Sequence, residues 1–82
     1  MILKYDIIFN KMKKVEIGDF LEKRRKSLRV TQRGLARLCG ISEHALSNLE
    51  SGIGNPTFDL LENVADALGL EISLVPKTLE PK

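Results

Sequence analysis

The most constraining feature of this chain is a set of four spaced residues near its middle. Counting from Gln32, the fifth residue is Ala36, the ninth is Gly40, and the fifteenth and eighteenth are Leu46 and Leu49. A small residue lets another helix cross close by, and glycine accepts the left-handed backbone of a tight turn. The two leucines anchor the second helix on a core. The spacing therefore predicts two short helices joined by a turn of about three residues.

Further helices are predicted on both sides of this pair. Apolar residues recur three and four positions apart from Ile17 to Leu28 and from Phe58 to Leu68, which is the period of one helix face. A hydroxyl residue precedes each later helix and can accept a hydrogen bond from its free backbone N–H groups. These residues are Thr31, Ser42 and Thr57.

The caps and apolar stripes together set the expected helix boundaries. After a first helix that includes residues 17–28, we predict helices over residues 32–38, 42–50 and 58–68, with Gly69 ending the last one. In the helix over residues 32–38, the apolar stripe is expected to consist of Leu35, Ala36 and Leu38.

The segment after Gly69 has a different period. Apolar and polar residues alternate from Leu70 to Leu74 and the pattern stops at Pro76, which is typical of a short, half-buried strand. One strand alone is not stable. Two partners fit: the same strand of a second subunit, with Ile72 and Leu74 at the dimer contact, or the alternating segment from Leu3 to Ile7.

Eighty-two residues form a single small domain. We predict an all-α fold of four to five helices with a short C-terminal β-strand that pairs across a dimer. The helical domain is expected over residues 15–70, after an N-terminal extension at 1–14 and before a strand and tail at 71–82. Met12 precedes a clean helix start and is an alternative first residue to Met1.

Charge and cysteine content narrow the function classes. The chain has 13 basic residues and a formal net charge of +2, and most of the basic residues lie in its first half. Such clustering attracts phosphate, but it is equally expected of a solvated helix face. A single cysteine, Cys39, cannot form an internal disulfide or a structural zinc site. No apolar run reaches the ~20 residues of a membrane span, so we expect a protein of the reducing cytoplasm with no membrane partner.

With these residues in place, the stretch from Ile17 to Leu70 resembles the lambda-repressor and Cro-like group of helix-turn-helix proteins, the XRE family. The matching positions are Thr31-Gln32, Leu35-Ala36, Gly40-Ile41-Ser42, Leu46-Ser47, Leu49-Glu50, Gly52, Pro56 and Leu68-Gly69. Two positions depart from the pattern. Arg29 stands where glycine usually follows the first helix, and Gly34 stands where an acidic residue is common. Either Arg29 adopts a left-handed backbone or the first helix ends differently.

The resemblance implies a lambda-repressor-like domain that binds double-stranded operator DNA. We therefore expect a homodimeric repressor that places the second helix of the pair in successive major grooves of a palindromic operator. On that helix, Ala45, Leu46 and Leu49 fall on one side, and the polar residues fall on the other. By resemblance, the base contacts are Glu43, His44, Asn48 and Ala45, the last against a thymine methyl group.

The resemblance also implies contacts outside the base edges. Gln32, at the start of a helix, is expected to meet a DNA phosphate. Further candidates for phosphate contacts are Arg33, Ser47, Asn55 and the backbone amide of Thr57. Arg25 and Glu50 match an arginine and a glutamate that pair structurally in the family, so Glu50 is interpreted as a clamp and not as a DNA contact.

No constellation of residues indicates an enzyme, and we expect no catalytic residues, no metal and no cofactor. The helical domain with a directly following strand resembles the antitoxin partners of HipA-type toxins, which repress their own operon and bind the toxin. The alternative class is a protein-interaction module in which DNA binding is secondary. That alternative is favoured by Glu43 and by the absence of Lys and Arg from residues 42–50.

Overall fold

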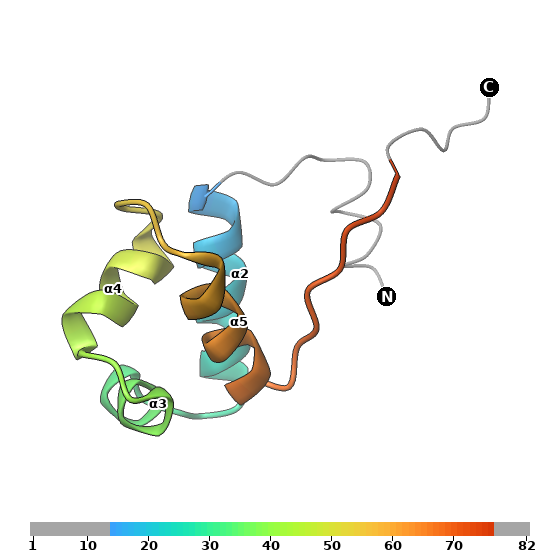
Figure 1. Cartoon of the computed structure of the whole chain (residues 1–82). Helices are drawn as coiled ribbons and strands as arrows, with labels where there is room; N and C mark the ends of the chain where they lie inside the picture. The colour runs from blue at the N-terminus through green and yellow to red at the C-terminus, as the bar shows by residue number, and fades with distance from the viewer. Residues whose placement is uncertain (1–13, 77–82) are drawn as a thin grey trace.

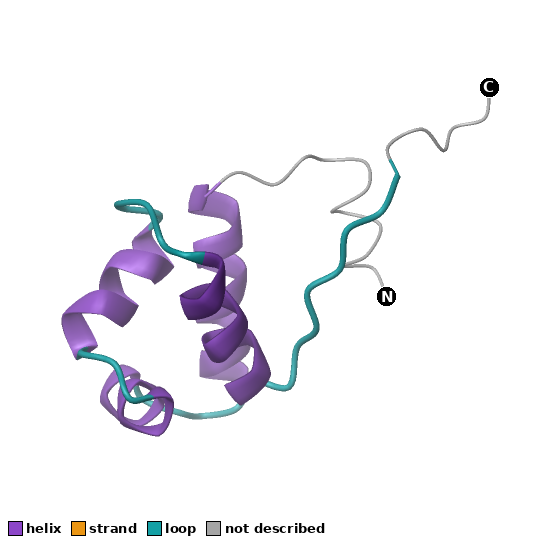
Figure 2. Ribbon diagram, in the orientation of Figure 1, coloured by secondary structure: helices purple, strands orange, loops and turns teal. Residues whose placement is uncertain are grey.

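The computed structural model describes residues 14–76, which form four helices followed by an extended segment (Figures 1 and 2). The helices are α2 (Lys14–Ser27), α3 (Gln32–Cys39), α4 (Glu43–Ser51) and α5 (Phe58–Ala67). Helix α4 packs against α2 and α3, and α3 also packs against α5. The predicted all-α domain is therefore confirmed.

The helix starts are fixed by the three predicted caps. The side-chain oxygens of Thr31, Ser42 and Thr57 accept hydrogen bonds from the third backbone N–H of α3, α4 and α5, at 2.9, 3.0 and 3.0 Å. Gly40 ends α3 with a φ of 71°, the left-handed conformation that the tight turn requires. The helix pair and its turn thus follow from local signals.

The core lies between all four helices and is built from their apolar faces. Its buried members are Leu21, Leu35, Ala36, Leu46, Leu49, Val64 and Leu68. Ala36, Leu46 and Leu49, which the spacing predicted as crossing and anchoring residues, are all at most 5% exposed. Their burial fixes α4 so that its opposite side faces away from the core.

Three apolar residues that the helical period assigned to buried faces are exposed. Leu38 is 70% exposed, because the buried face of α3 is centred on Leu35, Ala36 and the half-buried Cys39, and Leu38 lies about 100° away from that centre. Phe58 is exposed as the first residue of α5. Leu28 is also exposed, since α2 ends at Ser27 and the chain turns there.

The close packing of α2 and α4 depends on Gly18, which the sequence patterns did not single out. A Cβ atom at this position would meet the backbone carbonyl oxygens of Leu49 and Glu50 well inside van der Waals contact. The other end of α2 contacts the residue that caps α5, because Arg24 Nε donates a hydrogen bond to the carbonyl oxygen of Leu68 at 2.9 Å. Helix α2 is thereby held at both ends.

The backbone at Arg29 resolves the first departure from the family pattern. Arg29 has a φ of 59° and is the non-glycine residue of the described range with a positive φ. The N–H of Arg29 still donates to the carbonyl oxygen of Lys26 at 2.9 Å, and the N–H of Val30 donates to that of Arg25 at 3.2 Å. The turn is thus the one that glycine usually makes, taken here by arginine.

The short C-terminal strand is not formed in the single chain. Residues 71–76 run as an extended stretch without strand structure, because a strand is defined by a ladder partner and residues 14–76 of one chain supply none. Ile72 is half-buried, whereas Leu74 is 94% exposed. The alternative partner, Leu3 to Ile7, lies outside the described residues, so the pairing of this segment stays a prediction.

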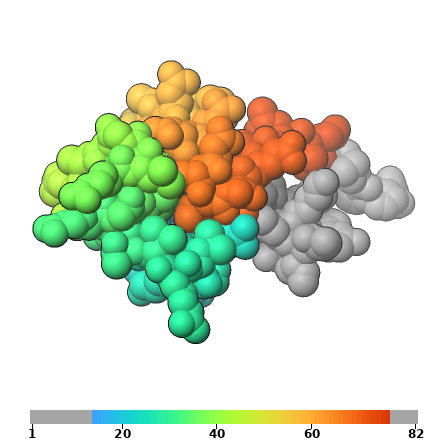
Figure 3. Space-filling view, turned by 90° about the horizontal axis from the view of Figure 1, so that it is seen from below, coloured from blue at the N-terminus to red at the C-terminus, as the bar shows by residue number. Residues whose placement is uncertain are grey.

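The extended stretch and the helix pair lie at opposite ends of the molecule. Helices α3 and α4, green and yellow-green, occupy one side, and the red segment after α5 leaves on the other (Figures 1 and 3).

Within residues 14–76, none of the helices has the length and apolar character needed to cross a membrane.

Candidate nucleic-acid interface

The side of α4 that faces away from the core carries the proposed base contacts. Glu43 and His44 are exposed, while Ala45 and Asn48 are half-buried at the edge of the face. Leu46, between them, is fully buried and Leu49 is nearly so. The N-terminal end of α4 is therefore the part that offers polar side chains to a partner.

Two of these side chains touch each other along the helix. Asn48 Nδ2 lies 3.4 Å from His44 Nε2, one turn away. An N–H of Asn48 can donate to this ring nitrogen when the imidazole proton is on Nδ1. The contact leaves the carbonyl oxygen and the second N–H of Asn48 for another partner, which is the pair of groups that binds adenine in two places.

Glu43 lies near a basic side chain of the neighbouring helix. Its Oε1 atom is 4.0 Å from Arg33 Nε, and both side chains are exposed. A pair of this kind is screened by salt and adds little to stability. Its effect is electrostatic: the Arg33 guanidinium offsets the negative charge of Glu43, which would otherwise repel nearby phosphates.

The candidates for phosphate contacts are spread over three places. Gln32 and Arg33 open α3, Ser47 is half-buried on α4, and Asn55 and Thr57 are exposed in the loop before α5. The structure brings Arg33 close to Glu43, whereas within residues 14–76 no hydrogen bond or ion pair joins Gln32 or Arg33 to Asn55 or Thr57.

The loop after α4 is tied to the helices at two points, and sequence reasoning missed both. Lys14 Nζ donates to the carbonyl oxygen of Gly54 at 2.7 Å, and the N–H of Ile53 donates to the carbonyl oxygen of Asn48 at 2.9 Å.

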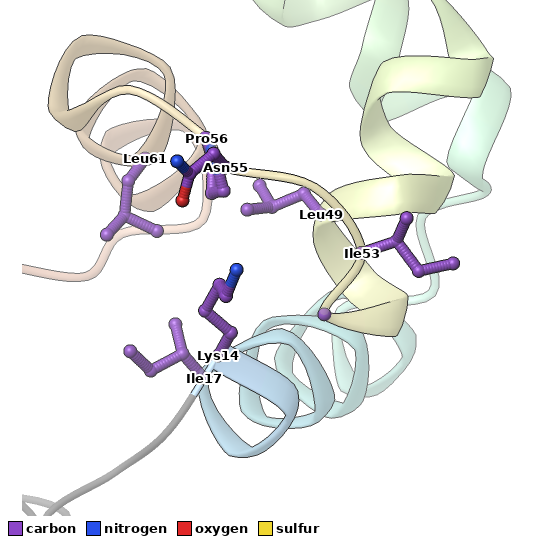
Figure 4. A pocket seen from close by; sticks show the side chains of 8 residues that line it. Lys14, Ile17, Leu49, Ile53, Asn55, Pro56 and Leu61 are labelled. Atoms are coloured by element: carbon purple, nitrogen blue, oxygen red, sulfur yellow. The ribbon is translucent and has the colours of Figure 1, made fainter.

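Below the loop is an apolar hollow of about 240 Å³ (Figure 4). Its lining includes Lys14, Ile17, Leu49, Ile53, Pro56 and Leu61.

Ile53 is a further candidate contact that sequence reasoning did not select. Its side chain is 58% exposed and borders a shallow hollow that Ala45 and Asn48 also line. An exposed apolar side chain beside polar ones suits a thymine methyl group or a sugar face. A β-branched residue directly after Gly52, where a loop residue is normally polar, was the available signal.

Arg25 and Glu50 form a buried ion pair between α2 and α4. Arg25 Nε donates to Glu50 Oε2 at 2.7 Å and Arg25 Nη2 donates to Glu50 Oε1 at 3.0 Å. The side chains are only 8% and 3% exposed. The hydrogen bond to Glu50 raises the pKa of Arg25, in opposition to burial, which lowers it. The pair is bidentate and buried, so it belongs to the interior and not to the exposed face.

The remaining reactive side chain, Cys39, belongs to the interior too. It is half-buried at the end of α3, packed against the core. Burial raises the pKa of its thiol, which lowers the thiolate fraction. Asn63 of α5 donates to the Cys39 carbonyl oxygen at 2.9 Å. The surroundings therefore suit a packing role.

The sequence of this chain is similar to those of known proteins. A family model described as helix-turn-helix matches residues 21–75. An uncharacterized HTH-type transcriptional regulator of Sinorhizobium fredii is 39% identical over 57 residues, 70% of this chain and 29% of the relative. One of Mycobacterium tuberculosis is 38% identical over 51 residues, 62% of this chain and 36% of the relative. The chain thus spans about a third of the length of the curated relatives it matches.

Proposed function

Because this chain belongs to the helix-turn-helix family, a DNA-binding and not an enzyme family, we propose that it is a sequence-specific DNA-binding regulator of transcription. The observation that carries the proposal is the orientation of α4. Leu46 and Leu49 bury one side of the helix, and the opposite side presents the polar residues of its N-terminal half. A helix held in this way fits the major groove.

Base readout is assigned to Glu43, His44, Ala45 and Asn48. The Asn48 amide suits adenine, the His44 ring donates to guanine, and the Glu43 carboxylate accepts from a cytosine amine. Ala45 is small enough to meet a thymine methyl group. The contact between His44 and Asn48 supports joint reading of neighbouring base pairs by these two side chains.

Phosphate contacts are assigned to Gln32, Arg33, Ser47, Asn55 and the Thr57 backbone amide. Gln32 and Thr57 stand at helix starts, where the partial positive charge of the helix favours an anion. These contacts would set the register of α4 on the duplex without choosing the sequence.

We further propose that the protein is a cytoplasmic homodimeric repressor of a palindromic operator. Two copies would place α4 in major grooves about one helical turn apart, roughly 34–36 Å. The extended segment after α5 leaves from the side opposite α3 and α4 (Figure 1), so two such segments could pair while α4 of both copies faces DNA. Occupancy of the operator would then block transcription.

The test is selection of bound sequences from a random duplex pool with the full chain, followed by footprinting on the best site. A palindromic consensus with half-sites about ten base pairs apart is expected. A pool that shows no enrichment over its starting composition would reject sequence-specific binding.

A second candidate is a protein-interaction module, of which an antitoxin that binds a HipA-like toxin is one form. It is favoured by α4 itself, which carries Glu43 and neither Lys nor Arg. Co-purification with the product of a neighbouring toxin gene, together with failure of the DNA selection, would favour this candidate.

A further inference from the structure

We propose that Glu50 is a positioning residue for DNA binding: its buried carboxylate holds the side-chain amide of Gln32 in place to donate to a DNA phosphate. The inference rests on the proposed function, since it explains how one phosphate contact is prepared. It adds a second role to a glutamate that the family resemblance interprets as a structural clamp alone.

The contact that carries the inference joins α3 to the end of α4. Gln32 Nε2 donates to Glu50 Oε1 at 2.9 Å. The same oxygen accepts from Arg25 Nη2 at 3.0 Å. One carboxylate oxygen of the buried pair is thus shared between an interior arginine and a half-buried side chain at the edge of the candidate interface.

The network continues to the backbone that leads into α3. Arg25 Nη1 donates to the carbonyl oxygen of Val30 at 2.8 Å, and Val30 directly precedes the Thr31 cap. Arg25 and Glu50 therefore fix both the chain entering α3 and the first side chain of that helix. The start of α3 is held through side chains as well as by its own cap.

The chemistry of the carboxylate decides which way the Gln32 amide is turned. An ionised carboxylate only accepts hydrogen bonds, so it must face the amide nitrogen and never the amide oxygen. One N–H is used by Glu50, and the second N–H on the same nitrogen remains to donate. A glutamine without this partner would present oxygen and nitrogen to a phosphate with equal ease, and the oxygen would be repelled.

The charge of Glu50 does not oppose an approaching phosphate. Arg25 neutralises it through two hydrogen bonds, and the Glu50 side chain is only 3% exposed. The buried pair therefore offers Gln32 an acceptor without adding a net charge near the interface. Holding a flexible side chain in its binding position before the partner arrives also lowers the entropy lost on binding.

The experiment compares Gln32→Ala in two backgrounds of the full chain, the natural one and Arg25→Met/Glu50→Met. Replacing both members of a buried pair by apolar residues of similar volume is often neutral for stability. The probe is a mixed-sequence 30-base-pair duplex, because a phosphate contact does not depend on sequence. Gln32→Ala is expected to weaken binding about tenfold in the natural background and less than about twofold in the Met/Met background.

Arg33→Ala is the matched control, because Arg33 is the next residue of α3 and its exposed side chain lies near Glu43 and is not bonded to the buried pair. Arg33→Ala should cause the same loss of duplex affinity in both backgrounds. An equal loss from Gln32→Ala in both backgrounds overturns the inference while the proposed function stands. If the natural chain binds no duplex at all, the proposed function fails and the inference falls with it.

A second measurement covers the case in which the Met/Met variant does not fold. In the natural chain, the order parameter of the Gln32 side-chain amide is compared by NMR with that of Asn55, an exposed amide in the loop. The inference expects a value near that of rigid backbone, ~0.85, for Gln32 and below ~0.6 for Asn55. A Gln32 amide as mobile as that of Asn55 overturns it.

Discussion

Gly18 of α2 lies so close to the carbonyl oxygen of Leu49 in α4 that no side chain fits between the two helices at this point. The neighbouring carbonyl oxygen of Glu50 closes the same space. The approach brings the end of α4 within reach of Arg25, two turns further along α2. The buried ion pair and the orientation of α4 thus depend on one missing methyl group.

The first prediction is that Gly18→Ala destabilises the protein. Alanine favours helix by up to ~1 kcal/mol over glycine, but the clash with backbone atoms must separate α2 from α4, so we expect a net loss of about 1–3 kcal/mol. Thermal melting measures it. Asp19→Ala is the control, because it removes only an exposed pair with Lys23 and should cost less than ~0.5 kcal/mol. Equal melting temperatures for the two variants would contradict the packing argument.

The second prediction concerns Arg29, whose φ is 59°. Glycine adopts this conformation without the ~1 kcal/mol cost that a side chain brings, although its unfolded chain is more flexible. Arg29→Gly should therefore leave stability unchanged or raise it by up to ~0.5 kcal/mol. Arg37→Gly, inside α3, should instead lose about 1 kcal/mol. Urea unfolding of both variants decides whether the backbone at Arg29 is strained.

The third prediction is that Glu50→Ala destabilises the fold by ~3 kcal/mol or more, because it leaves the buried Arg25 charge without its partner. The side-chain exposures of 8% and 3% place the pair in the costly class of buried pairs. Calorimetric melting should show Arg25→Met/Glu50→Met to be far more stable than Glu50→Ala. If Glu50→Ala melts at the natural temperature, the pair does not act as a clamp.

The fourth prediction separates base readout from backbone contact. Asn48→Ala should cost about 1–3 kcal/mol at the selected site and leave binding to mixed-sequence duplex nearly unchanged. Gln32→Ala should weaken both alike, since a phosphate carries no sequence information. Titrations of both duplexes with both variants give the four affinities. An Asn48→Ala variant with natural affinity for its site would remove Asn48 from the readout.

Features set by neighbours in the chain could be predicted from the residues alone, whereas the buried pair of Arg25 and Glu50 was predicted only through the family resemblance and other packing features were not predicted. The caps at Thr31, Ser42 and Thr57 and the left-handed Gly40 depend on a few adjacent residues. By contrast, the exposure of Leu38 depends on which face of α3 is covered by α4 and α5. The closeness of Gly18 to α4 and the hydrogen bond from Gln32 to Glu50 join residues 18 or more positions apart, for which a single sequence holds no local signal.

The fifth prediction concerns assembly through the segment after α5. Leu74 is 94% exposed in the single chain, so Leu74→Asp should leave the melting temperature of the monomer unchanged. If the segments of two copies pair, however, the same change introduces like charges near a two-fold axis and should prevent dimerisation.

Ending the chain after Leu70 should have the same effect, and it keeps Leu70, which packs against the core and whose N–H donates to the Ala65 carbonyl oxygen at 2.8 Å. Both variants are expected to sediment as monomers and to bind the palindromic site far more weakly, because dimerisation and operator binding are linked. A variant that still dimerises and binds normally rejects pairing through this segment. The alternative pairing with Leu3 to Ile7 makes the opposite prediction. Removal of the residues before Met12 should then weaken operator binding, and Leu74→Asp should leave the oligomeric state unchanged.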